Sequence, residues 1–155
     1  MIRPLPGSST SYLLSILRIV AGFLFIVHGT QKLFGFPASM PGGPVDMMTR
    51  AGVAGVIETF GGALLLLGLL TRPVAFLLSG EMAFAYFLVH APKGFWPLLN
   101  AGELSALYCF LFLYFAAAGG GPISVDALIA RLSHADRADR THHGHIGEHA
   151  LPRRA

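Results

Sequence analysis

Residues 53–90 read VAGVIETFGGALLLLGLL-TR-PVAFLLSGEMAFAYFLVH, two long apolar runs separated only by Thr71 and Arg72. Each run reaches the ~17 to 25 residues that a helix needs to cross about 30 Å of hydrocarbon. Pro73 suits the first turn of a helix, because the N–H group that proline lacks would have been unpaired there. The stretch therefore predicts two membrane-spanning helices joined as a tight antiparallel hairpin.

Apolar runs of similar length lie on both sides of this hairpin. The four predicted spans are Tyr12–Leu33, Val53–Leu70, Pro73–His90 and Leu98–Ala118. The composition agrees, since 54% of the residues are hydrophobic, 12% are charged and mean hydropathy is +0.62. An average soluble domain has roughly 25% charged residues. We therefore expect an all-α polytopic membrane protein, an antiparallel bundle of four transmembrane helices.

The segments that flank the four spans are expected to lie outside the bundle. We expect an N-terminal cytoplasmic segment (1–11), the four-helix domain (12–118), an interfacial segment (119–132) and a disordered tail (133–155). Ser124 is placed to cap a short amphipathic helix in the interfacial segment. The tail carries histidines that could grip a metal only if it were ordered, and a solvated tail is the favoured interpretation: His142, His143, His145 and His149.

Several classes of function are disfavoured by what the sequence lacks. Cys109 is the single cysteine, so one chain can form no disulfide, CxxC redox pair or thiolate metal site. No Glu-x-x-His pair, no histidine pair at spacing four within a span and no phosphate- or dinucleotide-binding glycine loop is present, so neither metal nor haem is indicated. The net charge of +3 comes largely from arginines beyond residue 130, and no nucleic-acid partner is expected.

Basic residues flanking the spans predict the orientation. Four spans place both termini on one side, and the larger share of basic residues falls on that side: Arg3, Arg72, Arg131, Arg137, Arg140, Arg153 and Arg154, against Lys32, Arg50 and Lys93 on the other. Basic residues accumulate on the cytoplasmic side of membrane proteins. We therefore expect both termini in the cytoplasm and the bundle in the inner (cytoplasmic) membrane.

Ionisable groups interrupt every span. A lone charge near the bilayer centre costs roughly 2.5 to 3.5 kcal/mol, so such groups usually pair or carry function. Arg18 in the first span and Glu81 in the third lie at matching depth, about 9 to 12 Å from the cytoplasmic end at ~1.5 Å rise per residue. We predict that Arg18 and Glu81 form a structural ion pair, with a buried switch or proton relay as the alternative.

Glu58 is the leading functional candidate. Steps of four residues place it on one helix face with Ala54 and Gly62, and such a small-residue face permits close approach of a neighbour or leaves space for a ligand. We expect its carboxyl to point inward, either as a proton or quinone site or as an interhelical hydrogen-bonding group.

Two further candidates share the outer half of the membrane with Glu58. His28 is a possible proton donor or metal ligand, or a hydrated group at the interface. The Lys32 side chain is expected to extend to water. Glu103 is also placed there, although Asn100 to Glu103 has the spacing of a capping box, which would explain both residues without function.

Aromatic residues, including twelve phenylalanines, accompany these polar groups. A quinone would suit such a bundle, since its isoprenoid tail prefers lipid and its carbonyls need hydrogen-bond donors. The same composition would equally suit lipid alone. The catalytic candidates are Glu58, His28 and Glu103, and quinone is the one cofactor we consider.

Motifs in all but the third span carry a resemblance to a known family. They are Leu17-Arg18, His28-Gly29-Thr30-Gln31-Lys32-Leu33-Phe34-Gly35, Ile57-Glu58-Thr59-Phe60-Gly61-Gly62, Thr71-Arg72-Pro73, Asn100-Ala101-Gly102-Glu103 and Gly119-Gly120-Gly121-Pro122-Ile123-Ser124-Val125-Asp126. In order and spacing, from about Leu14 to Asp126, the chain resembles the DoxX family of four-helix membrane proteins of bacteria and archaea.

The resemblance implies a fold more firmly than a reaction. The family takes its name from a small subunit associated with a terminal quinol oxidase and with thiosulfate:quinone oxidoreduction. We therefore expect an accessory or quinone-interacting subunit of a membrane redox system, in contact with lipid, with redox-enzyme partner subunits and as a homo-oligomer. The alternatives are a small proton or solute transporter or channel, and a non-catalytic membrane scaffold for a soluble partner.

Overall fold

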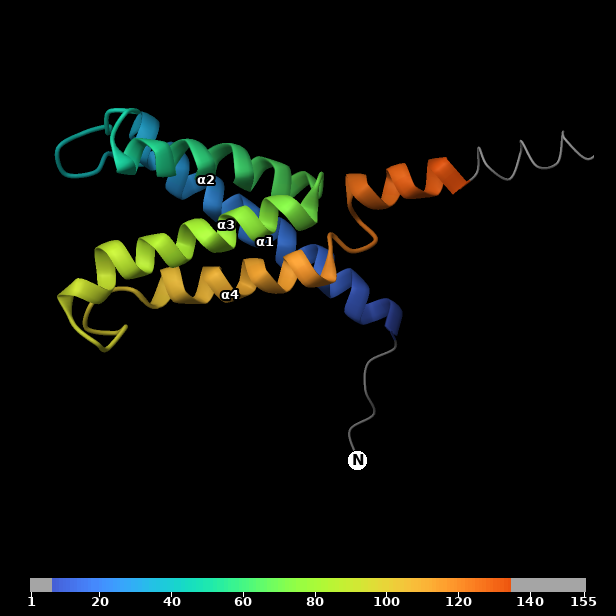
Figure 1. The fold of residues 1–155 in the computed structure, drawn as a ribbon. Coiled ribbons are helices and arrows are strands. Elements are labelled where there is room, and N and C mark those ends of the chain that lie inside the picture. Colours follow the sequence, from blue (N-terminus) through green and yellow to red (C-terminus); the bar gives the residue numbers. More distant parts are fainter. Residues whose placement is uncertain (1–6, 135–155) are drawn as a thin grey trace, which may run out of the picture.

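The computed structural model describes residues 7–134, and this part of the chain contains helices and turns with no strand. In chain order the elements are α1 (Gly7–Phe34), α2 (Arg50–Leu67), α3 (Thr71–Ala85), the π-helix η1 (Tyr86–His90), the 3₁₀-helix η2 (Ala91–Lys93) and α4 (Glu103–Ala118). Residues 125–134 form a further helix. Helix α1 packs on α2, α3 packs on α4, and α2 contacts α3 (Figure 1).

Three of these elements are long and apolar enough to cross a membrane. They are Ser9–Phe34, Arg50–Leu67 and Thr71–Lys93, whereas α4 is a shorter apolar helix of 16 residues. The expected all-α membrane protein is confirmed at this level. The expected tail from residue 135 onward and residues 1–6 lie outside the described part of the chain.

The predicted start of the last helix is wrong. Helix α4 begins at Glu103, with Gly102 as its N-cap, so neither a start at Leu98 nor the expected capping box is formed. The Asn100 carboxamide instead donates to the Gly94 carbonyl and accepts from the Gly102 N–H, with a donor–acceptor distance of 2.8 Å in each bond. These bonds hold the chain in a folded turn, because Asn side chains compete with helical hydrogen bonding.

The α2–α3 hairpin is formed as predicted, with Pro73 in the first turn of α3. Gly68 ends α2 in the left-handed conformation, at φ 70°, which glycine adopts without steric cost. Its N–H donates to the Leu65 carbonyl and the Leu69 N–H to the Leu64 carbonyl, each over 3.0 Å. These bonds satisfy carbonyls that the end of the helix would otherwise leave unpaired.

Glycines bring the backbones of α1 and α2 into contact. A Cβ atom added to Gly22 would lie 2.7 Å from the Leu66 nitrogen and 2.9 Å from the Gly62 carbonyl oxygen. One added to Gly29, two turns further along α1, would lie 2.7 Å from the Gly55 carbonyl oxygen. Such small-residue contacts are typical of helix pairs in membranes. We call this contact the glycine seam.

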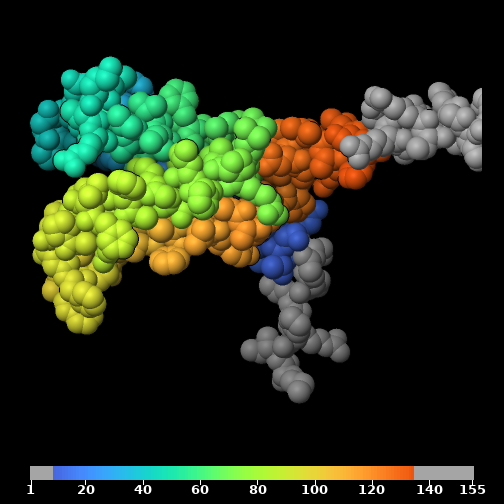
Figure 2. All heavy atoms as spheres, viewed as in Figure 1, coloured from blue at the N-terminus to red at the C-terminus, as the bar shows by residue number. Residues whose placement is uncertain are grey.

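The two ends of the helix assembly are built from different segments. We call the end that holds the start of α1 the proximal end, and it also carries the α2–α3 turn and residues 119–126. The distal end carries residues 35–49 and 86–102, coloured cyan and yellow in Figure 2. The helix of residues 125–134 extends from the proximal end (Figure 1).

Arg18 is fully buried at the proximal end, where its guanidinium joins three segments. It donates to the Leu65 and Leu66 carbonyls in the last turn of α2, and to the Gly120 and Ile123 carbonyls after α4. A cation is favoured at the C-terminus of a helix, where unpaired carbonyls concentrate negative charge. The predicted Arg18–Glu81 ion pair is therefore wrong, because backbone carbonyls occupy the guanidinium.

Asp126 fastens the same end from the other side. Its carboxylate accepts hydrogen bonds from the Leu70 and Thr71 N–H groups, with a donor–acceptor distance of 2.8 Å in each, and so caps the start of α3. Its own N–H donates to the Gly68 carbonyl. Burial opposes ionisation of this carboxyl, but these N–H groups and the charge of Arg18 outweigh that effect and lower its pKa.

The expected cap of the following helix is also present. The Ser124 hydroxyl accepts from the Ala127 N–H over 3.1 Å, at the start of the helix of residues 125–134. The exposed apolar side chains of that helix are Leu128, Ile129 and Leu132. Its amphipathic character agrees with the sequence analysis, and its position at a membrane interface stays a prediction.

The glycine seam predicts an unequal response to the same substitution. Gly22→Ala should lower the melting temperature of the detergent-solubilised protein, because the new methyl group would strike the backbone of α2. Gly80→Ala is the matched control, since nothing lies within 4 Å of its Cβ position. The control should be neutral or stabilising by up to ~1 kcal/mol from helix propensity. Equal melting of the two variants would contradict the close backbone contact.

The Arg18 contacts predict that removing Glu81 as well does not restore the stability lost when Arg18 is replaced. Arg18→Leu should destabilise strongly, because each buried carbonyl left unpaired costs about 1–3 kcal/mol, whereas the exposed Arg131→Leu should have little effect. In detergent melting, the losses of Arg18→Leu and Glu81→Leu should add to within about 0.5 kcal/mol in the double variant. Recovery in the double variant would restore the ion-pair hypothesis.

The Asp126 cap predicts a pH-dependent contribution to stability. Because the pKa of Asp126 is lowered on folding, its contribution is present above about pH 4 and is lost as the pH falls through the folded value. Asp126→Ala should cost about 0.5–2 kcal/mol at pH 7, in line with lost helix caps. Melting curves of wild type and variant should converge once the pH is below the folded pKa of Asp126, and a constant difference would show that the carboxylate charge is irrelevant.

Candidate functional site

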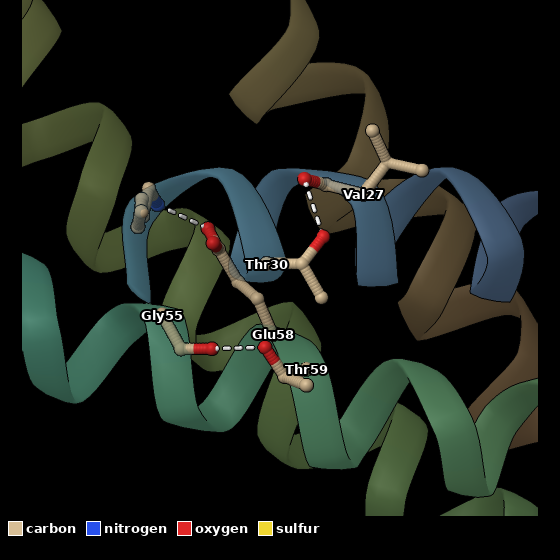
Figure 3. Close-up of polar contacts among 6 residues, drawn as sticks. Val27, Thr30, Gly55, Glu58 and Thr59 are labelled. Carbon is tan, nitrogen blue, oxygen red and sulfur yellow. Dashed lines mark hydrogen bonds and ion pairs between the residues drawn. The ribbon is translucent and has the colours of Figure 1, made fainter. Parts of the chain in front are cut away.

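A part-buried ion pair joins α1 and α2 inside their membrane-spanning stretches. The Lys32 Nζ lies 2.5 Å from the Glu58 Oε1, and the side chains are 25% and 3% exposed. Figure 3 shows Glu58 reaching from α2 towards α1, where a dashed line marks this pair. The inward orientation predicted for Glu58 is confirmed. The prediction that Lys32 extends to water is wrong, because its ammonium binds this carboxylate.

The glycine seam is what allows the pair to form. A Cβ atom on Gly55, one turn before Glu58, would lie only 3.1 Å from the Lys32 Cβ, so α1 passes directly over this turn of α2. Beside the pair, the Thr59 hydroxyl donates to the Gly55 carbonyl and the Thr30 hydroxyl to the Val27 carbonyl (Figure 3). These hydroxyls are thereby satisfied within their own helices and leave the Glu58 carboxylate to Lys32.

Glu81 brings a second carboxyl to this place from α3. It interacts electrostatically with Glu58 and with Lys32. One oxygen of each carboxyl, the Glu58 Oε2 and the Glu81 Oε2, is buried and has no hydrogen-bond partner among the described residues. A buried carboxyl oxygen without a donor is costly, so these two atoms are the open hydrogen-bonding positions of the site.

His28 completes the group from α1, one turn before Lys32. It interacts electrostatically with Glu58, and its ring centroid lies 6.5 Å from that of Tyr108 on α4. Tyr108 in turn stacks on Phe112 at 5.2 Å and meets Phe25 at 5.4 Å. We call His28, Lys32, Glu58 and Glu81 the intramembrane cluster; an aromatic wall of Phe25, Tyr108 and Phe112 adjoins it.

Other predicted site residues stay apart from the intramembrane cluster. Glu103 is exposed at the first position of α4 and is not among the groups that act electrostatically on Glu58. Arg18 is held at the proximal end. His90 lies in the distal connection, with its Nδ1 3.0 Å from the Asn100 carbonyl oxygen. Of the three catalytic candidates, the structure brings together Glu58 and His28.

Sequence reasoning missed Lys32 as a member of the cluster, although a usable signal was present. His28 and Lys32 are four residues apart and therefore share a helix face, so a cavity lined by one is lined by the other. Tyr108 carried no comparable signal, because one aromatic residue in an apolar helix looks like any other core residue.

The side chains of the cluster can form hydrogen bonds and ion pairs. Among residues 7–134, no group of three or more His, Cys, Asp or Glu side chains is arranged to hold a metal ion. Two open cavities, of about 450 Å³ at the proximal end and about 350 Å³ at the distal end, include no cluster member in their walls. The cluster offers an ammonium, two carboxyls and an imidazole.

Comparison with known proteins places the chain among membrane proteins. The family model described as DoxX matches residues 13–91. An uncharacterized protein of Haemophilus influenzae is 53% identical over 121 residues, which cover 74% of this chain and 89% of the relative. An uncharacterized membrane protein of Mycobacterium tuberculosis is 30% identical over 133 residues, covering 74% and 80% of the two chains.

A third relative has a name that suggests an activity. This Bacillus subtilis protein, named "Putative oxidoreductase CatD", is 27% identical over 116 residues, covering 74% of this chain and 84% of the relative. No solved structure matches the chain. The family model covers the first three apolar elements, including all four residues of the intramembrane cluster. By this match, which spans half of its residues, the chain belongs to the DoxX family of membrane proteins.

Proposed function

We propose that this DoxX family membrane protein is an accessory subunit of a membrane redox system and that it binds a quinone at the intramembrane cluster. The observation that carries the proposal is the part-buried Lys32–Glu58 pair together with the buried, unpartnered Oε2 atoms of Glu58 and Glu81. Donors and acceptors with unused capacity inside an apolar protein are the usual means of orienting a ligand.

The chemistry of the cluster complements a quinone head group in both redox states. A quinone carbonyl accepts hydrogen bonds, for which Lys32 and His28 provide donors, and a quinol hydroxyl donates, for which the Glu58 Oε2 provides an acceptor. The neighbouring rings of Tyr108, Phe112 and Phe25 offer flat apolar surface to a flat ring. The isoprenoid tail would lie along the exposed apolar faces of the helices, which contact lipid.

The proposed membrane arrangement extends the three long spans by α4. In this arrangement α4 is the fourth span, and the bilayer is locally thinner beside this shorter helix. Both termini and the proximal end lie on the cytoplasmic side of a bacterial inner membrane. The cluster then lies in the outer half of the inner membrane. Redox-enzyme subunits and further copies of this chain are the proposed protein partners. The oxidoreductase name of the Bacillus subtilis relative agrees with a redox role.

A proton or solute transporter is the second candidate, and one observation favours it. Charged groups from three helices, α1, α2 and α3, meet within the spans, and ionisable residues at such depth commonly mark ion or proton paths. A scaffold that binds a soluble partner through residues 125–134 is the third. Quinone binding separates the first candidate from the other two.

The decisive experiment measures quinone in purified protein. Wild type extracted in mild detergent should carry quinone detectable by mass spectrometry of a solvent extract, and Glu58→Gln should carry at least tenfold less. The expected factor follows from a hydrogen bond to a charged group, worth about 1.5–3 kcal/mol. Glu103→Gln is the matched control, because that carboxyl is exposed and outside the cluster, and it should retain wild-type quinone.

Loss of fold must be separated from loss of binding. The double variant Lys32→Gln and Glu58→Gln keeps a neutral hydrogen-bonding pair and should elute and melt near wild type while binding little quinone. Quinone content unchanged in both variants, or wild type that neither carries nor takes up added quinone, would overturn the proposal.

A further inference from the structure

We infer that Glu81 holds a proton that Glu58 and His28 can receive, so that the intramembrane cluster is a proton-binding site in its own right. The inference concerns the same residues as the proposed function, but it needs no quinone. It assigns Glu81, which sequence reasoning placed in an ion pair with Arg18, to a different role.

The hydrogen bonds of the two carboxyls lead to this inference. Lys32 occupies the Glu58 Oε1, whereas the Glu58 Oε2 and the Glu81 Oε2 are buried without a donor among the described residues. Two interacting anions, each with a buried oxygen that lacks a donor, would be costly in hydrocarbon. A proton on one carboxyl supplies the missing O–H donor and removes one of the charges.

Charge balance gives the same result. Glu81 interacts electrostatically with Lys32 of α1 and Glu58 of α2, and Glu58 also interacts with His28. The His28 ring centroid lies 6.5 Å from that of Tyr108 on α4. One ammonium can neutralise one carboxylate. The second carboxyl is neutral when it carries a proton, because like charges at short range do not both ionise readily.

His28 gives this proton a second position at no change in net charge. In one arrangement Glu81 is a carboxylic acid and His28 is neutral; in the other Glu81 is a carboxylate and His28 is an imidazolium. The transfer breaks the Glu81 O–H bond and forms an N–H bond on His28, with the Glu58 Oε2 as the intermediate acceptor, and no electron moves. Glu58 interacts with both end groups, which makes it the middle position.

Infrared spectroscopy of quinone-free protein in lipid nanodiscs tests the inference. The carbonyl stretch of a buried carboxylic acid should be present in wild type at pH 7 and should shift on exchange into D₂O. Glu81→Gln should abolish it, and Glu103→Gln should leave it unchanged, because Glu103 is exposed and lies outside the intramembrane cluster. Absence of the band in wild type, or its persistence in Glu81→Gln, would overturn the inference.

Lys32→Met provides an independent arm that keeps both carboxyls. With the ammonium gone, both carboxyls should be protonated and the band should roughly double in area. An unchanged band would show that Lys32 does not set the number of protons. Failure of this inference can be told apart from failure of the proposed function. A carboxylic-acid band in protein that binds no quinone would support the proton site alone, and quinone binding without the band would support the quinone site alone.

Discussion

The hydrogen bonds of the Arg18 guanidinium are the interaction on which the arrangement of the helices depends. Four backbone carbonyls, from the end of α2 and from the segment after α4, meet on this one side chain of α1. In a membrane no water can replace these partners, so each must come from the chain itself. Asp126 adds the start of α3 to the same end. Helices α1, α2 and α3 and the segment after α4 are thus joined at one end of the molecule.

The two polar centres of the molecule differ in how completely their groups are paired. At the proximal end Arg18 meets carbonyls at each of its three nitrogens. In the intramembrane cluster, Glu58 and Glu81 each keep an open oxygen. A saturated centre fixes structure, whereas a centre with unused hydrogen-bonding capacity pays for it in stability and is retained where it binds something. The contrast is why we place function at the cluster.

Sequence patterns predicted the structural features that are determined within a single helix or turn. Segment length predicted the apolar spans, and capping preferences predicted the turn before Pro73 and the Ser124 cap. The spacing of four residues between small side chains predicted that Glu58 points inward. Depth arguments failed for Arg18 and Glu81, because depth along an axis says nothing about which way a helix is rotated. The partners of Arg18 are backbone carbonyls, which every residue has, so no sequence signal marks them.

The glycine seam has a consequence for how the family can vary. The neighbours that crowd Gly22 are the Gly62 carbonyl oxygen and the backbone of Leu66. A larger residue at Gly22 cannot be balanced by a smaller one opposite, because backbone atoms are the same in every residue. Substitution here has no compensating partner. The contacts that set the distance between α1 and α2 should therefore be invisible to methods that infer proximity from correlated substitutions.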